Sequence, residues 1–566
     1  MSILRVVHAV LRKVTGSGRL LVVCAVLVAV PSVPLQAQLI FNDLHDFNCN
    51  VEGCNPFDLG YLTQGVDGNL YGTGYAGYGG IIMLTPSGAN TDLWTFNGAT
   101  GRHPYGGLTL ASDGNFYGTT FNGGTSDLGV VFRFTPPGTL TVLHSFDGTD
   151  GENPEVAPTQ GKDGNLYGVT GSGTTYRVTL PSGTFQQLPN SVPPGTGGWC
   201  GQCTQLYLAS DGNLYGATET GGQFNAGTIY SMDTSGAITI VHSFQASGSD
   251  GADPVGPLTQ ASDGYLYGTT SFGGANGSGE VFKMTLGGSL TLLHSFDALD
   301  CCGYNSDGAW PDAGVVAAPD GYFYGVSLVA GLNGYGTIYR ITSGGAFEKL
   351  FDFSGDAGAF PGSVSSTTLV EHTNGSMYGL TEIGGPFENG NYFSLTPQNN
   401  RVQIVRIAGP IFVHPGIPVQ ILGNSLTQAY SVAFAGEPTS FRVGSDTVLT
   451  AQVPQDAVDG LITLTYVTGL QAQTQLPIHI MPAINSFDPP SGPPGTRVTI
   501  AGGGFTGATQ VSFGSANASF TFVSPTQIVA TVPVPAKNGG SWVPATRIQV
   551  TTPNGTAKSK KVFRIR

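Results

Sequence analysis

Charged residues are scarce in this chain of 566 residues, at 10% of the total, whereas glycine alone accounts for 86 residues. So much glycine and so little charge exclude a protein built mainly of long helices and favour one rich in turns. The length also exceeds what a single hydrophobic core usually serves. We therefore expect several all-β units.

Long hydrophobic runs are missing after residue 38, so the body of the chain offers no membrane-spanning helix. The one apolar run, residues 20–30, is 11 residues long, where a span needs about 20. It follows basic residues and precedes Leu35, Gln36 and Ala37, which is the order of a cleaved secretory signal. We predict that residues 1–37 are a signal peptide and that the mature chain is secreted or held at the cell surface. A retained membrane anchor is the alternative.

Basic residues are few between residues 38 and 401, which contain 8 of them against 31 acidic residues, a net charge of −23. Residues 402–566 contain 10 basic and 5 acidic residues, a net charge of +5. An acidic body repels phosphate backbones and attracts cations. We therefore predict no nucleic-acid partner.

Signatures of common enzymes are also absent: the chain has no HExxH, G-x-S-x-G, Walker loop or dinucleotide-binding fingerprint. Glutamates outside the repeated turns occur singly, at Glu155, Glu219, Glu280, Glu371, Glu382 and Glu388. Hydrolysis of a glycosidic bond needs two carboxyl groups at a set separation, and nothing in the sequence selects a pair. We therefore assign no catalytic residue and no cofactor.

Cysteine is sparse, and the six cysteines that follow the signal form three local pairs: Cys49 with Cys54, Cys200 with Cys203, and Cys301 with Cys302. A zinc site would need a second Cys-x-x-Cys besides residues 200–203, and there is none. In an exported protein we predict local disulfides that hold loop shape, with free or metal-binding thiols as the alternative. The adjacent Cys301 and Cys302 could form a strained ring or cross-link elsewhere.

One hexapeptide, by contrast, is abundant. It begins as DGNLYG at residue 67 and recurs in related forms at residues 113, 163, 211, 263, 320 and 374. The spacings, from 46 to 57 residues, suit a four-stranded propeller blade. Asp-Gly between two apolar-alternating runs predicts a hairpin, because glycine adopts positive φ and the aspartate caps the turn.

A second marker, LHSF, recurs in related forms at residues 44, 93, 143, 185, 241, 293 and 350. Its first copy precedes the first hexapeptide, and the seventh hexapeptide has no copy after it. A closed ring explains this offset, because residues 39–47 can supply the missing fourth strand of the last unit. We predict a seven-bladed β-propeller over residues 38–401; an open repeat array and two separate sheets are the alternatives.

These residues resemble the bacterial choice-of-anchor tandem-repeat family, whose unit is called the GloVer repeat. DGNLYG, a Gly-Gly pair, a Val-Phe-Arg strand and LHSF match that unit over roughly residues 39–400. The chain departs from the pattern in the third unit, where the loop is GSGTT, and in the seventh, where Asn374 replaces aspartate. The resemblance implies an exported protein with C-terminal attachment modules, and it implies no enzymatic activity.

A different pattern of short strands and Pro/Gly turns begins near residue 402. Residues 482–566 resemble the IPT/TIG immunoglobulin-like family in the turn SGPPG at residue 491, the strand VTIAG at residue 498 and the pair Val532-Pro533. Residues 402–481 run in parallel more loosely. We predict two immunoglobulin-like β-sandwiches, 402–481 and 482–566.

Four histidines, His45, His144, His242 and His294, share one place in the LHSF strand, which favours a packing role over a ligand role. In the loops that follow, the calcium candidates are Asp147, Asp150, Asp250 and Asp253, because calcium prefers several oxygens in a flexible loop. The alternative is that these aspartates only form turns, since no loop has the spacing of a known calcium motif. The tryptophans that could stack on sugar rings are Trp94, Trp199 and Trp310, although Trp94 aligns with a repeated core position.

Three functions remain open. The leading hypothesis is an exported, noncatalytic binding or surface-associated protein whose partner is an extracellular ligand, with glycan or cell envelope as candidates. The second is a secreted enzyme acting on polysaccharide, and the third is a structural component of a matrix or envelope. In each case the repeat would present loops and the two C-terminal modules would act as spacer or attachment.

Overall fold

A computed structural model describes residues 39–48, 61–74, 77–192, 203–246, 250–356, 358–397, 404–534 and 545–566. The chain divides into two compact units, Met1–Gln38 and Leu39–Arg566, and the predicted signal peptide lies outside the described residues. Within the described residues, no helix is both long and apolar enough to cross a membrane.

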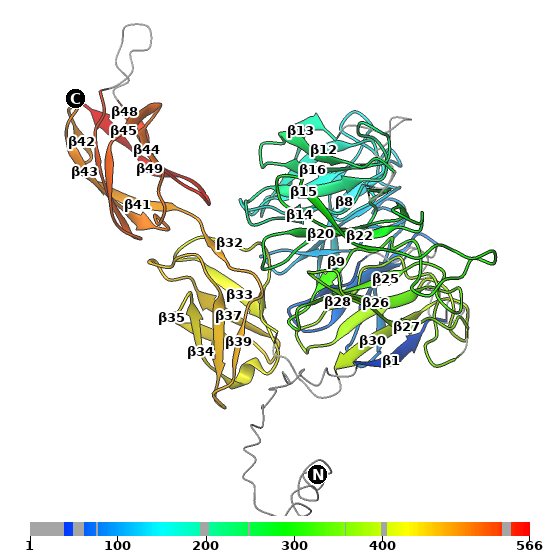
Figure 1. Cartoon of the computed structure of the whole chain (residues 1–566). Helices are drawn as coiled ribbons and strands as arrows, with labels where there is room; N and C mark the ends of the chain where they lie inside the picture. Colours follow the sequence, from blue (N-terminus) through cyan, green and yellow to red (C-terminus); the bar gives the residue numbers. More distant parts are fainter. Residues whose placement is uncertain are drawn as a thin grey trace, which may run out of the picture. The chain divides into compact units, whose positions relative to one another are not determined.

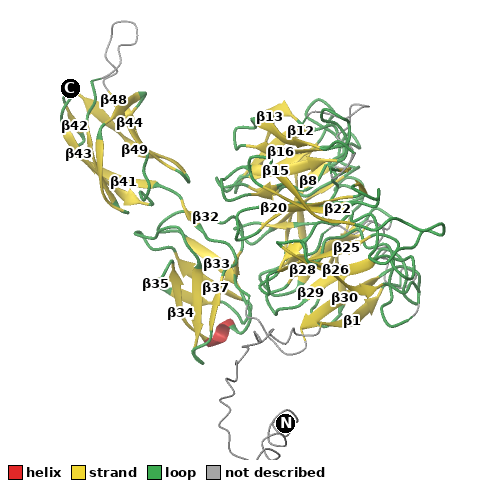
Figure 2. Cartoon of the chain, viewed as in Figure 1, coloured by secondary structure: helices red, strands yellow, loops and turns green. Residues whose placement is uncertain are grey.

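The described chain is all-β, as predicted, with a single 3-10 turn, η1 (Leu426–Gln428), among its strands (Figure 2). Its repeat region contains seven four-stranded antiparallel sheets, which we number units 1 to 7. In units 1 to 6 the strands are hydrogen-bonded in chain order, so each unit is a meander of the kind that the hexapeptide hairpin predicts.

The strands of the seven units are as follows: unit 1, β2 (Thr63–Gln64), β3 (Leu70–Gly74), β4 (Gly80–Leu84), β5 (Asn90–Thr95); unit 2, β6 (Thr109–Leu110), β7 (Phe116–Thr120), β8 (Val130–Thr135), β9 (Thr139–Ser145); unit 3, β10 (Thr159–Gln160), β11 (Leu166–Val169), β12 (Thr174–Thr179), β13 (Thr184–Ser191); unit 4, β14 (Tyr207–Leu208), β15 (Leu214–Thr218), β16 (Thr228–Met232), β17 (Ile238–Ser243); unit 5, β19 (Thr259–Gln260), β20 (Leu266–Thr270), β22 (Glu280–Met284), β23 (Leu290–Ser295); unit 6, β24 (Val316–Ala317), β25 (Tyr322–Ser327), β26 (Thr337–Thr342), β27 (Phe347–Asp352); unit 7, β28 (Val370–Glu371), β29 (Met377–Leu380), β30 (Asn391–Pro397), β1 (Leu39–Asp46). A small extra ribbon joins β18 (Gly251–Ala252) to β21 (Phe272–Gly273).

Six of the seven hexapeptide turns are held by an aspartate. In unit 2 the Asp113 carboxylate accepts the backbone N–H of Asn115 through Oδ1 and the Tyr117 hydroxyl through Oδ2, at 3.0 and 2.8 Å. Gly114 between them has φ +80°, a conformation that only glycine adopts without strain. The glycine after the tyrosine, Gly118, faces an aromatic ring, since a Cβ there would lie 2.5 Å from Phe132. These contacts explain why Asp, Gly, Tyr and Gly recur together.

The last unit takes its fourth strand from the start of the described chain. β1 pairs antiparallel with β30 from Leu39 opposite Pro397 to Asp46 opposite Asn391, and the two strands lie side by side in Figure 1. Seven hydrophobic clusters each join two consecutive units, and one of them packs Phe47 and Tyr392 of unit 7 against Leu70 of unit 1. The series of units therefore closes on itself.

Residues 404–481 and 483–566 each form two main sheets over one core, and we call them the first and second C-terminal modules. The first contains β31 (Arg406–Ile407), β32 (Phe412–Val413), β33 (Pro418–Leu422), β34 (Ala429–Phe434), β35 (Glu437–Thr439), β36 (Phe441–Val443), β37 (Val448–Gln452), β38 (Ile462–Tyr466), β39 (Gln471–Gln473), β40 (His479–Ile480). The second contains β41 (Ala483–Asp488), β42 (Ser491–Gly492), β43 (Arg497–Gly503), β44 (Gln510–Phe513), β45 (Ala516–Ala518), β46 (Phe520–Ser524), β47 (Gln527–Thr531), β48 (Ala545–Thr552), β49 (Gly555–Ile565).

The two modules match strand by strand. One sheet runs β31-β33-β37-β36 in the first module and β41-β43-β47-β46 in the second, and the other sheet pairs β35, β34 and β38 as it pairs β45, β44 and β48. Each module also adds a short parallel pairing, β32 with β40 and β42 with β49. The two modules therefore share one strand order, and a common origin of the two stays a prediction.

Candidate functional site

One pocket of about 530 Å³ collects loop residues from all seven units, and we call it the loop pocket. In six units the residue four positions before the first strand lines it: Tyr105, Glu155, Cys203, Val255, Asp312 and Ser366. We call these the variable positions, because six equivalent sites carry six different residues. The corresponding residue of unit 1 lies outside the described residues, and Tyr61 of that unit lines the pocket nearby.

A repeated backbone bend holds these loops in place. The residue two positions before each variable position is left-handed in five units, with φ between 51° and 59°, at His103, Asn153, Asp253, Trp310 and Val364. Its carbonyl accepts the N–H of a residue one or two positions after the unit's second strand, as from Phe121 to His103 and from Glu382 to Val364. Phe121, Leu328 and Glu382 line the pocket from that second position. The framework of the pocket is therefore repeated although its side chains are not.

Acidic residues from successive units meet at the loop pocket. Burial raises the pKa of Glu155 to about 7, with the neighbouring Glu219 adding to the shift. Burial likewise raises the pKa of Asp312 to about 6, with Glu219 and Asp253 contributing. Asp253 itself has a raised pKa, from burial and from Glu219. These acids belong to units 3, 4, 5 and 6, so residues that are isolated in the sequence form one electrostatic group.

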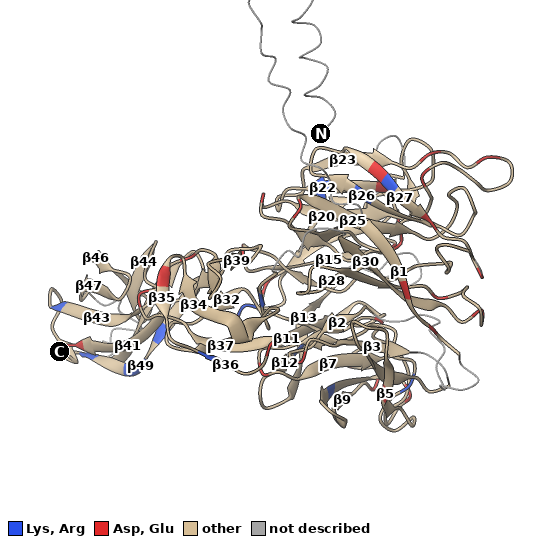
Figure 3. Ribbon diagram, turned by 90° about the horizontal axis from the view of Figure 1, so that it is seen from below, with Lys and Arg blue, Asp and Glu red and all other residues tan. Residues whose placement is uncertain are grey.

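The rest of the lining is aromatic, neutral or acidic, with Tyr61, Tyr105 and Phe121 from units 1 and 2 and Glu382 from unit 7. None of the described residues that line the loop pocket is basic. The pocket therefore combines aromatic surfaces with carboxylates that accept hydrogen bonds. Figure 3 shows acidic residues on the loops of the repeat region, in a ribbon that carries few charges of either sign.

Exposed aromatic and leucine side chains occur on the loops between second and third strands, the set of loops that brings Phe121, Leu328 and Glu382 to the loop pocket. The loops between second and third strands expose Tyr78, Phe224, Phe272, Leu332, Tyr335 and Phe387. The loop before β24 adds Leu299 and Tyr304, and Phe272 packs near Trp310 with ring centroids 5.5 Å apart. Apolar side chains that gather on one set of loops, at a pocket, indicate a contact surface.

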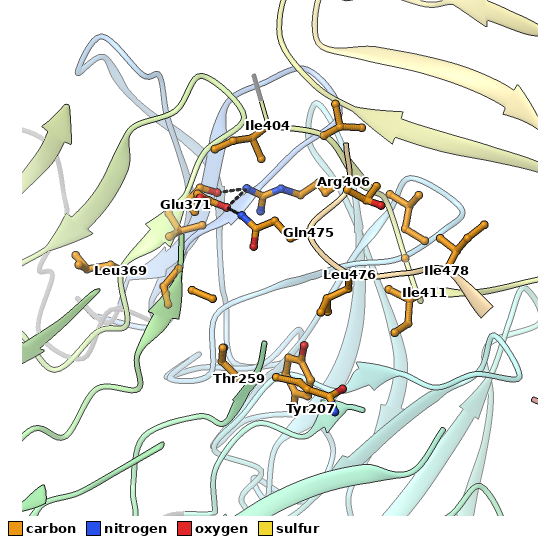
Figure 4. A pocket seen from close by; sticks show the side chains of 18 residues that line it. Tyr207, Thr259, Leu369, Glu371, Ile404, Arg406, Ile411, Gln475, Leu476 and Ile478 are labelled. Carbon is orange, nitrogen blue, oxygen red and sulfur yellow. Dashed lines mark hydrogen bonds and ion pairs between the residues drawn. The ribbon is translucent and has the colours of Figure 1, made fainter. Parts of the chain in front are cut away.

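A second pocket, of about 400 Å³, lies where the first strands of units 4 to 7 meet the first C-terminal module, and we call it the junction pocket (Figure 4). The units present Tyr207, Thr259, Val316 and Val370 at one equivalent position. The module contributes mainly apolar side chains from residues 404–411 and 474–478.

Its polar corner consists of Glu371, Arg406 and Gln475, which lie close together in Figure 4. Gln475 Nε2 donates to Glu371 Oε2 at 2.7 Å, Arg406 Nη2 lies 3.9 Å from the same oxygen, and Nη2 also donates to the Glu371 carbonyl. Burial raises the pKa of Glu371 to about 7, although Arg406 opposes the shift.

The repeated histidines pack as predicted, and each of three also has an acidic partner that the sequence did not reveal. Every LHSF-type histidine meets the phenylalanine two residues later edge to face, with centroids 4.7 to 5.1 Å apart. His144 Nε2 lies 2.7 Å from Asp150, His242 Nε2 3.0 Å from Asp250, and His294 Nε2 2.8 Å from Asp307. The partner follows at spacings of 6, 8 and 13 residues, which hides the pairing in the sequence.

The four calcium candidates are engaged in other ways. Asp150 and Asp250 contact histidines, Asp147 accepts the backbone N–H of Thr149 at 2.9 Å, and Asp253 joins the acids of the loop pocket. The described residues contain no group of three or more His, Cys, Asp or Glu side chains that could hold a metal ion. Calcium binding thus stays an untested prediction.

The cysteine pairs have different outcomes. Cys301 and Cys302 are exposed free thiols with Sγ atoms 3.6 Å apart, so the predicted disulfide is absent there. A disulfide needs about 2.05 Å between its sulfurs, so the 3.6 Å separation is not a bond. A disulfide between adjacent residues would also close a strained ring. Cys203 is buried at the loop pocket. Cys203 is itself disulfide-bonded, whereas its predicted partner Cys200 and the pair Cys49 and Cys54 lie outside the described residues, so those pairings stay predictions.

The remaining tryptophans and glutamates named from the sequence lie at separate places in the structure. Trp94 packs against a core cluster of units 1 and 2, as its repeated position predicts, and Trp199 lies outside the described residues. Glu280 is buried beside Asp250, and burial raises its pKa to about 7. Glu388 is exposed. Aligning the units on their first strands and seeking a position that never repeats would have found the loop pocket.

Solved structures resemble the chain only distantly. A fungal alcohol oxidase of the AA5 family, in complex with copper, shares 12% identity over 78% of this chain and 99% of its own, with a TM-score of 0.43. SGBP-B of Bacteroides uniformis, from a complex xyloglucan utilization locus, shares 17% identity over 29% of this chain and 49% of its own, with a TM-score of 0.15. A surface glycan-binding protein of Prevotella bryantii shares 15% identity over 26% and 37%, with a TM-score of 0.18. At these values the likenesses carry no argument about ligand or activity.

Family comparisons are decisive for the repeat. No curated protein matches the chain in sequence. The IPT/TIG domain matches residues 482–564, which confirms the resemblance of the second C-terminal module. The Gloeobacter/Verrucomicrobia repeat matches residues 34–179, 169–305 and 202–408, which together span about two thirds of the 566 residues. The chain therefore belongs to the Gloeobacter/Verrucomicrobia repeat family.

Proposed function

We propose that this protein is an exported, noncatalytic binding protein whose ligand, a glycan, is held at the loop pocket. One observation carries the proposal: positions that build the units are copied from unit to unit, whereas the six variable positions that face one pocket all differ. Side chains that only hold a fold repeat with the fold. A position that is free to differ in every unit, on a repeated framework, suits recognition of an asymmetric ligand.

The chemistry of the pocket favours a sugar. Tyr61, Tyr105 and Phe121 offer ring faces for the apolar faces of sugar rings, and Glu155, Asp312 and Glu382 offer acceptors for hydroxyl groups. The exposed aromatic side chains around the pocket would extend contact to neighbouring sugars of a longer chain.

In this proposal the seven units are the blades of a seven-bladed β-propeller, which the closure of unit 7 by β1 supports. The two C-terminal modules are immunoglobulin-like β-sandwiches that act as spacer or attachment, which their two-sheet cores support. Export follows from the predicted signal peptide.

A polysaccharide-acting enzyme is the second candidate, and the acids of the loop pocket favour it. Glu155, with a raised pKa of about 7, is protonated in about half of the molecules at neutral pH, and a general acid must be protonated. Asp312, with a pKa of about 6, is mostly ionised there. Glycoside hydrolysis would also need an ionised carboxylate across the substrate.

A glycan array followed by a reducing-end assay separates these functions. The mature chain from Gln38 should bind at least one glycan, release no reducing ends, and lose binding when Tyr105 and Phe121 are both replaced by alanine. Tyr304→Ala with Tyr335→Ala, which changes the surrounding surface and not the pocket, is the matched control and should weaken only the longer glycans. Release of reducing ends would establish the enzyme. Binding that survives the pocket variant, or no binding at all, would refute the proposal.

A further inference from the structure

The junction pocket is built like a site for a small amphiphile. Its volume of about 400 Å³ is within the range of ligand pockets, which are mostly apolar with a few convergent polar groups. Ile411, Leu476 and Ile478 of the first C-terminal module form an apolar wall, Ile404 lies beside the polar corner, and Leu369 lies on the side opposite the wall (Figure 4). The two charged groups of the lining, Glu371 and Arg406, lie together with Gln475 at one corner.

Arg406 is the cation of this corner. It lines the pocket, and its side chain is 33% exposed. Among the described residues its acceptors belong to Glu371 alone, the carbonyl and, at 3.9 Å, one carboxylate oxygen. A guanidinium has five N–H donors, so donors are left for a ligand. Arginine binds carboxylates through two parallel hydrogen bonds, which makes a carboxylate the matching acceptor.

Glu371 shows a second, independent sign of an incomplete site. It is 8% exposed, and its Oε1 is buried without a hydrogen-bond partner. A buried carboxylate that is only partly satisfied is costly, and the cost falls when the group is neutral. Glu371 is therefore easily protonated. When it is protonated, a ligand carboxylate can bind Arg406 without a second negative charge beside it.

We propose that the junction pocket binds an aliphatic carboxylic acid, with its carboxylate on Arg406 and its hydrocarbon chain against the apolar wall. The site is separate from the loop pocket, because its lining residues are at the first strands and in the first C-terminal module. Binding takes up a proton at Glu371. The charged groups near that carboxyl are Arg406 and Asp320, and the neighbouring His372 has a pKa below its usual value because burial favours the neutral imidazole.

Calorimetric titration of the mature chain with decanoate, 1-decanol and decylamine tests this proposal. At pH 6.5 decanoate should bind at least tenfold tighter than the alcohol or the amine. At pH 7.5, where Glu371 is largely ionised before binding, the difference between two buffers should show proton uptake. The affinity for decanoate should fall as the pH rises above 7, because ionised Glu371 then repels the ligand. Equal binding of decanoate and decanol, or no binding of decanoate, would overturn the proposal.

Four variants locate the site. Arg406→Leu should lose at least tenfold in decanoate affinity, whereas Arg442→Leu, an exposed arginine of the same module, should not. Glu371→Gln, which imitates the protonated carboxyl, should bind decanoate without proton uptake and without the loss above pH 7. Ala317→Phe fills the pocket while leaving the polar corner intact, and it should abolish binding at an unchanged melting temperature. Decanoate binding that survives Arg406→Leu or Ala317→Phe would contradict the site.

Discussion

The hexapeptide turn and the loop pocket occur in the same units, yet their residues follow opposite rules. Six units place a tyrosine hydroxyl on the aspartate of the turn at 2.6 to 2.9 Å, and in the seventh Asn374 donates to Tyr378 instead. The variable positions carry Tyr, Glu, Cys, Val, Asp and Ser in six units. Repetition thus marks what stability requires, and its absence marks where one face of the molecule is specialised.

The largest expected effect comes from removing a strand that stability requires. Deletion of residues 39–47 takes β1 from unit 7, exposes the edge of β30, and removes Phe41 and Phe47 from their clusters. Burial of one phenylalanine contributes about 1.5–3 kcal/mol, so the free energy of unfolding should fall by at least about 3 kcal/mol. Thermal unfolding followed by circular dichroism measures it. An unchanged melting temperature would show that the series of units does not depend on closure.

Replacing an acid of the loop pocket should instead raise the free energy of unfolding. The pKa of Glu155, about 7 in the folded chain, exceeds the unfolded value of about 4.3. The protonated form of Glu155 therefore contributes fully to stability below the unfolded-state pKa, and this contribution is lost as the pH rises through the folded-state pKa of about 7. Glu155→Gln, which stays neutral, should therefore raise the free energy of unfolding at pH 8 by on the order of 1–3 kcal/mol.

The same variant should change stability little at pH 4, where the glutamate is protonated in the folded chain. Urea unfolding at the two pH values provides the comparison. Glu388→Gln, an exposed glutamate of unit 7, serves as the control and should have no such pH-dependent effect. A loss of stability at pH 8 in Glu155→Gln would mean that the carboxylate supports the fold.

A smaller loss is expected at a repeated hydrogen bond. Tyr117→Phe removes the 2.8 Å hydrogen bond from the tyrosine hydroxyl to Asp113 and leaves the buried ring in place. An average hydrogen bond contributes about 1 kcal/mol, so urea unfolding should show a loss of that order. The equivalent change in unit 6, Tyr324→Phe, which likewise removes one hydrogen bond to an aspartate from a buried ring, should give the same loss within error. Unequal losses would mean that equivalent turns are not equivalent in energy.

Much of the fold could be predicted because its signals are local or countable. The hexapeptide predicts a turn from neighbouring residues, and the offset between hexapeptides and LHSF strands predicts that residues 39–47 join the last unit. The histidine–aspartate contacts could not be predicted, because loops of different length separate the partners. The loop pocket was hidden because Glu155, Glu219 and Asp312 are far apart in sequence and meet only through the packing of the units. Likewise, nothing in the sequence connects Glu371 with Arg406.

Titration of one array-selected glycan into Tyr105→Ala and Tyr117→Phe, with the melting temperature of each variant, tests the central claim most directly. The first tyrosine lines the loop pocket and the second holds a repeated turn. We predict at least a tenfold loss of affinity, about 1.4 kcal/mol, for Tyr105→Ala with an unchanged melting temperature. Tyr117→Phe should lower the melting temperature and leave affinity unchanged. Affinity that falls with Tyr117→Phe, or is kept in Tyr105→Ala, would contradict the division between repeated framework and variable pocket.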